Sequence, residues 1–163
     1  MFHDSTNTAS LFSVLFAALI FSLSLAGAAA AQGNTRLGDF ALRSNTTGGE
    51  NTAIGVNVLQ RNTTGGSNTA SGVGALSSNT MGSLNTASGA DALFNNTTGS
   101  QNIAIGINTL NSNTTGSLNT AIGTNADVSA ENLTNATAIG ANAIVNASNK
   151  IRLGNDSVTV IEG

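Results

Sequence analysis

The chain repeats itself with a period of 17 residues. Seven glycines keep this step, namely Gly38, Gly55, Gly72, Gly89, Gly106, Gly123 and Gly140. Two asparagine columns and one leucine column keep it too: Asn34, Asn51, Asn68, Asn85, Asn102 and Asn119; Asn45, Asn62, Asn79, Asn96 and Asn113; Leu42, Leu59, Leu76, Leu93 and Leu110. A period this strict means that each unit adopts one local conformation and packs on the next. The sequence therefore predicts a stacked, rod-like chain.

The residues within one unit favour short strands and turns over helices. In Asn51–Ser67, Gly or Asn-Thr interrupts every apolar run, and no apolar face recurs at helical spacing. We expect two strands in this unit, around Thr52–Ile54 and Val58–Gln60. One unit then forms one coil. The predicted fold class is all-β, a parallel β-solenoid of about seven 17-residue coils preceded by a hydrophobic, signal-like helix.

The first strand of each unit has two different sides. Ile103 and Ile105 lie on the same side, and two β-branched apolar residues are expected to face away from water. This places the Thr/Ile/Ser side in the interior, together with the leucine column. The predicted core is Ile54, Leu59, Leu76, Leu93, Ile103, Ile105, Leu110, Ile122 and Ile139.

The other side of that strand carries one alanine per unit. The alanines considered for self-association are Ala53, Ala70, Ala87, Ala104 and Ala121. An unvarying small residue favours the close approach of another surface, and the alternative is a small side chain that is merely exposed. A coil of this size encloses a thin core, which is marginal for a lone chain. We therefore expect association with further copies, as a trimer or a filament.

Two corners are predicted in each coil. The position two after each repeated glycine holds Asn, Gly or Asp, the residue types that tolerate positive φ. The predicted turn residues are Gly55, Asn57, Gly72, Gly89, Gly106, Asn108 and Gly123. The Asn-Thr-Thr-Gly sequences form the second corner, where Asn side chains can bond their own backbone or the Asn of the next coil.

The second corner also contains Asn-x-Thr triplets. Asn45, Asn62, Asn96 and Asn113 are thus candidate glycosylation sites for a chain that enters a eukaryotic secretory path. The alternative is that a repeat rich in Asn and Thr produces such triplets by composition alone.

The N-terminal residues differ from the repeats. Residues 11–25 are apolar and uncharged, and an alanine-rich stretch follows them. This predicts a secretory signal peptide over 1–31, cleaved after Ala31, and a secreted or cell-surface protein. The alternative is an uncleaved membrane anchor over 11–31. Beyond it we expect a cap and first coil over 32–50, regular repeats over 51–123, and irregular coils with a terminal strand over 124–163.

Composition excludes several function classes. Charged residues make up 8% of the chain and the net charge is −3, which argues against nucleic-acid binding. His3 is the single histidine and there is no cysteine, so the predicted mature chain lacks the usual catalytic bases, nucleophiles and zinc ligands. We therefore predict no enzyme activity, no cofactor and no metal site. Threonine columns such as Thr52, Thr69 and Thr86 leave an ice-binding solenoid as an alternative.

Two resemblances point to fibrous proteins. The repeat region, Asn34–Gly154, resembles the head repeats of trimeric autotransporter adhesins. The resemblance is strongest at Asn102–Gly106 and Thr137–Gly140. That resemblance implies a parallel β-roll in which three chains form a stiff head that binds host matrix. Asn149–Gly163 resembles the segment before the chaperone domain of phage tail fibres and tailspikes. It implies the shaft of a trimeric fibre.

The sequence thus predicts a secreted structural or adhesive module that self-associates into a surface fibre or filament. Its expected partners are copies of itself, with surface glycans or matrix as further candidates. Contact with a membrane is expected only through residues 11–31, if these are retained. The alternatives are a phage-like tail-fibre shaft and an ice-binding solenoid.

Overall fold

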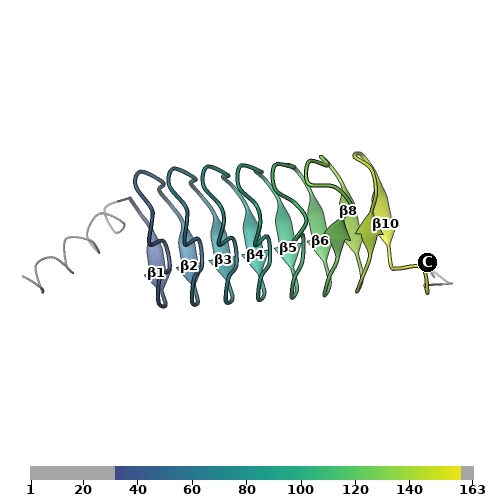
Figure 1. Cartoon of the computed structure of the whole chain (residues 1–163), viewed down its shortest axis with the longest axis horizontal. Helices are drawn as coiled ribbons and strands as arrows, with labels where there is room; N and C mark the ends of the chain where they lie inside the picture. Colours follow the sequence, from purple (N-terminus) through teal and green to yellow (C-terminus); the bar gives the residue numbers. More distant parts are fainter. Residues whose placement is uncertain (1–31, 159–163) are drawn as a thin grey trace, which may run out of the picture.

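A computed structural model describes residues 32–158, which form a parallel β-solenoid (Figure 1). The predicted signal peptide or anchor and the last five residues lie outside the described residues. The main sheet has eight strands, in the order β1-β2-β3-β4-β5-β6-β8-β10. Their bounds are β1 Thr35–Leu37, β2 Thr52–Ile54, β3 Thr69–Ser71, β4 Thr86–Ser88, β5 Ile103–Ile105, β6 Thr120–Ile122, β8 Thr137–Ile139 and β10 Ile151–Leu153.

The register of this sheet follows the repeat. Thr52 pairs with Thr69, and the same 17-residue offset holds from β1 to β8. The last pair has a shorter step, because Ile151 of β10 pairs with Thr137 of β8. A second, two-stranded sheet joins β7 (Asp127–Val128) to β9 (Ile144–Val145) in the irregular C-terminal coils.

The predicted second strand, around Val58–Gln60, is wrong: this segment is a series of turns. Asn57 has a φ of 59° and Leu59 a φ of 48°. Both values lie in the left-handed region, so the segment cannot be an extended strand. Neighbouring coils are still hydrogen-bonded there, for example from Leu59 N to Ala75 O at 3.1 Å. The inter-coil ladder therefore continues through the turn without forming a strand.

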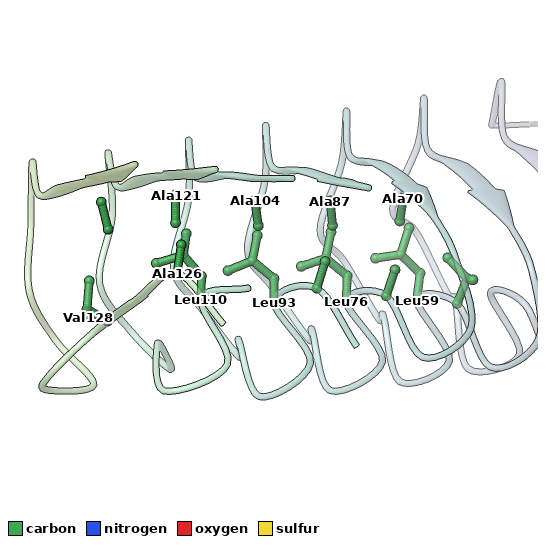
Figure 2. Close-up of a cluster of buried hydrophobic side chains, with 14 of the residues drawn as sticks. Leu59, Ala70, Leu76, Ala87, Leu93, Ala104, Leu110, Ala121, Ala126 and Val128 are labelled. Carbon is green, nitrogen blue, oxygen red and sulfur yellow. The ribbon is translucent and has the colours of Figure 1, made fainter. Parts of the chain in front are cut away.

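The strand's two sides are reversed relative to the sequence prediction. The alanines are fully buried, whereas the isoleucines predicted as core, Ile54, Ile103, Ile105, Ile122 and Ile139, are each about two-fifths exposed. Figure 2 shows the alanines pointing inward at the leucine column of the opposite wall. Leu59, Leu76, Leu93 and Leu110 are buried as predicted. The alanines are at most 1% exposed, so a larger side chain in their place would have to displace its neighbours in the close-packed interior.

The glycine column after each strand is a turn, as predicted. Gly72 has a φ of 127°, a region closed to residues with a Cβ, and an added Cβ would overlap the Gly89 carbonyl. Asn57 and Asn108 also have positive φ. The corner residues are therefore structural in every regular coil.

Two ladders of buried asparagines complete the interior. In the first, Asn79 Nδ2 donates to Asn62 Oδ1 at 2.7 Å; in the second, Asn68 Nδ2 donates to Asn51 Oδ1 at 3.0 Å. Asn79 and Asn68 both donate to the Gly82 carbonyl at 2.9 Å, which joins the two ladders. Throughout the described residues every buried side-chain N or O has a hydrogen-bond partner. The polar interior is thus satisfied, as a buried amide column requires.

The N-terminal end of both ladders is closed by one side chain. Gln32 Oε1 accepts from Asn45 Nδ2 at 2.9 Å and from Asn34 Nδ2 at 3.4 Å. Its Nε2 donates to the Thr46 carbonyl at 2.8 Å. Gln32 therefore supplies the hydrogen bonds that a preceding coil would give.

Candidate association face

The outward positions of the eight main strands form one surface, which we call the outer face. Its first column is Thr35, Thr52, Thr69, Thr86, Ile103, Thr120, Thr137 and Ile151. Its second column is Leu37, Ile54, Ser71, Ser88, Ile105, Ile122, Ile139 and Leu153. The parallel register places each residue of a column directly beside its counterpart in the next coil. The outer face is therefore a regular array of Thr, Ser and aliphatic side chains.

Further apolar side chains border the outer face in sequence. Val56, Val73 and Ile107 follow the corner glycines that end their strands, and they are 40%, 56% and 57% exposed. Leu84 and Leu118 stand two residues before β4 and β6, and they are also exposed. Exposed apolar side chains that gather along one side of a protein are typical of an interaction surface.

Charge is absent from the outer face between residues 32 and 158. The strands of the main sheet do contain two charged residues, Arg36 and Arg152, but both lie in register with the inward alanines. A surface without charge carries no electrostatic barrier to the approach of an identical surface.

The alanine column does not form the association surface. Ala53, Ala70, Ala87, Ala104 and Ala121 are at most 1% exposed and pack against the chain's own leucines (Figure 2). The close approach predicted for them is real, but the surface they approach belongs to the same chain. These alanines are therefore core residues of the single chain.

The candidate glycosylation sites are also contradicted in the folded chain. Asn62, Asn96 and Asn113 are fully buried, and their Nδ2 atoms each donate two hydrogen bonds. Asn45 is partly buried, and its Nδ2 donates to Gln32 and Gly48. The amide nitrogen that would carry a sugar is thus committed to the ladder.

One carboxyl group has a perturbed environment. Burial raises the pKa of Asp127, while hydrogen bonds from Ser112 and from the Val128 N–H act in the opposite direction. Both Asp127 oxygens lie near Ser112 N, at 3.2 and 3.1 Å. Within residues 32–158, no three His, Cys, Asp or Glu side chains gather into a metal-binding group. The same residues contain no helix that is long and apolar enough to cross a membrane.

Sequence reasoning missed the outer face, although a signal for it is present. Ser71 and Ser88 occupy the same column as Ile54 and Ile105, and a column that accepts both serine and isoleucine is typical of a surface. The alanine column never varies in the regular coils, which is typical of a tight interior. Chemical variation within a column thus indicates which side of the strand faces solvent better than the hydrophobicity of the column's most apolar residue does.

No protein-family model, no curated protein and no solved structure matches this chain. The function is therefore inferred from the geometry of the outer face.

Proposed function

We propose that the protein is a secreted, rigid β-solenoid that associates with copies of itself through the outer face and builds a surface fibre or filament. The observation that carries this proposal is the exposure of Ile54, Ile103, Ile105, Ile122 and Ile139 on one uncharged side of a regular sheet. Burying such side chains against another copy removes apolar area from water, which is the main driving force of association.

The dimensions of the outer face support this role. Eight strands at about 4.8 Å spacing give a face roughly 34 Å long. The three-residue strands are about 10 Å wide, so they present on the order of 340 Å². The bordering corner residues would have to add about as much again to approach the ~800 Å² that each partner buries in a standard stable interface. Because every copy has the same repeat, two faces can align coil against coil. The trimeric adhesin heads that the repeat resembles offer a precedent for such side-by-side packing.

The association is tested by the mass of the full-length chain in solution. Sedimentation velocity of the wild-type chain is expected to show a discrete oligomer or filament. The double variant Ile103→Lys, Ile105→Lys is expected to sediment as a folded monomer, because it places like charges at the centre of the interface. Thr98→Lys, at the exposed second corner, is the matched control and should behave like wild type. A folded wild-type monomer at all concentrations would refute self-association.

Ice binding is the second candidate, because the Thr52, Thr69 and Thr86 column lies on the outside rather than in the core. A flat threonine column with one residue per coil repeats at about 4.8 Å and can order water. Thermal hysteresis of the purified chain is expected if this face binds ice, and Thr69→Lys should abolish it. No hysteresis in the wild-type chain at concentrations where it sediments as a monomer would eliminate the candidate.

A further inference from the structure

Both ends of the main sheet replace the inward alanine by arginine. Arg36 of β1 pairs with Ala53, and Arg152 of β10 pairs with Ala138. Between them the column is alanine in every strand, and each of these alanines is buried. β1 and β10 are the outermost strands of the sheet (Figure 1). The exchange of alanine for arginine therefore coincides with the two edges of the sheet.

The arginine at the C-terminal edge is held in place by its own coil. Arg152 Nε donates to the Gly154 carbonyl at 3.0 Å, and its guanidinium pairs with the Asp156 carboxylate at 2.5 Å. These contacts keep the charged group beside the strand. At the N-terminal edge Arg36 is exposed. It pairs with Ala53 of the next coil, and the Ala53 side chain points into the core.

An added strand would meet these arginines directly. In a parallel ladder, residues of one column stack at the strand spacing of about 4.8 Å. If a second copy stacked end to end, its β1 would pair with β10 of the first copy, and the guanidinium of Arg36 would lie over that of Arg152. The inner strands bury a methyl group at this position, so the junction would bury the unpaired Arg36 guanidinium, the Arg152–Asp156 pair and excess volume. Inward-pointing charges on edge strands prevent such pairing in β-sheet proteins.

We propose that Arg36 and Arg152 close the two edges of the sheet against end-to-end stacking, so that the edge strands of two copies do not pair. The partner excluded at these edges is a second copy of this chain. This inference does not depend on the proposed side-by-side association, because a monomer would also require closed edges to stay in solution.

The test reverses one of the two charges. In Arg36→Glu a carboxylate would face Arg152 of the next copy, so negative-stain images of the full-length chain should show particles at integer multiples of the wild-type length. The double variant Arg36→Glu, Arg152→Glu restores like charges and should return to the wild-type length. Arg61→Glu, an equal change of charge at an exposed corner, is the matched control and should not alter the length. High salt should shorten the Arg36→Glu particles.

Particle length and particle thickness separate this inference from the proposed function. Loss of side-by-side association changes the thickness, or the mass per unit length, and leaves the length unaffected. An unchanged length in Arg36→Glu, with a wild-type circular dichroism spectrum, would overturn the role of the arginines. Long particles in the double variant would overturn it as well.

Discussion

The inward and the outward sides of the same short strand differ in how strictly the repeat specifies them. Inward, each regular coil has one alanine in contact with the leucine of the opposite wall. Outward, threonine, serine and isoleucine replace one another from coil to coil. The inward side is limited by volume, so a single residue type is accepted. The outward side has no such volume limit, and there both polar and aliphatic residues occur.

The largest expected effect comes from placing the same charge on the two sides of β5. Ala104→Asp buries an unpaired carboxylate among apolar side chains and should cost more than about 4 kcal/mol of unfolding free energy, or prevent folding. Ile105→Asp, one residue away but exposed, should change it by less than about 1 kcal/mol when it is compared with the wild type at concentrations where both are monomers. Urea unfolding followed by circular dichroism measures both. Equal effects would mean that the two sides are not different environments.

A smaller effect is expected from interrupting an asparagine ladder. Asn96 Nδ2 donates to Asn79 Oδ1 and to the Gly99 carbonyl, and Asn96 Oδ1 accepts from Asn113 Nδ2. Asn96→Ala removes the only donor to Asn79 Oδ1 and one acceptor of Asn113 Nδ2. The Gly99 carbonyl keeps its bond from Asn85, and Asn113 keeps its bond to the Gly116 carbonyl. The variant should therefore cost about 1–3 kcal/mol. The adjacent Asn95 is exposed, so Asn95→Ala is the control and should cost less than about 0.5 kcal/mol. If the two variants unfold at the same urea concentration, the ladders do not stabilise the fold.

The sequence predicted the architecture because the period itself reports stacking. The 17-residue glycine, asparagine and leucine columns led to the parallel solenoid, the corners and the buried leucines. The orientation of the strand could not be predicted from Ile103 and Ile105, because an isoleucine exposed to water in one chain is consistent with contact to another. Nor could the pattern predict that Leu59 is buried in a left-handed conformation, because leucine rarely adopts it.

The N-terminal coil has an aromatic residue at a corner position of positive φ that the regular coils fill with Asn, Gly or Asp. Phe40 has a φ of 60° in the column where other coils have Asn, Gly or Asp, and it is 53% exposed beside Arg43. Phe40→Asn should relieve the strain of this positive φ and raise the unfolding free energy by about 1 kcal/mol. Loss of the cation–π contact with Arg43 should offset a small part of this gain. Asp39→Asn is the neighbouring control. A loss of stability in Phe40→Asn would show that the aromatic contact outweighs the strain.

The smallest effect concerns the irregular C-terminal coils, where Asp127 stands 17 residues after Leu110. Burial raises the pKa of Asp127 above its ordinary value of 3.8, so the folded chain binds more protons than the unfolded chain just above that pH. The stability contributed by this group is therefore complete below pH 3.8 and is lost as the pH rises through the folded-state pKa. Asp127→Asn should flatten this part of the curve of unfolding free energy against pH. An unchanged slope would contradict the assignment.

Thiol labelling tests the orientation of the strand most directly, since the chain contains no cysteine of its own. The Ile105→Cys and Ala104→Cys variants would be treated with a maleimide at low protein concentration, with and without urea. We predict that Ile105→Cys reacts at nearly the same rate in both conditions, and that Ala104→Cys reacts only when the chain is unfolded. Fast labelling of folded Ala104→Cys, together with protection of Ile105→Cys at every protein concentration, would contradict the account.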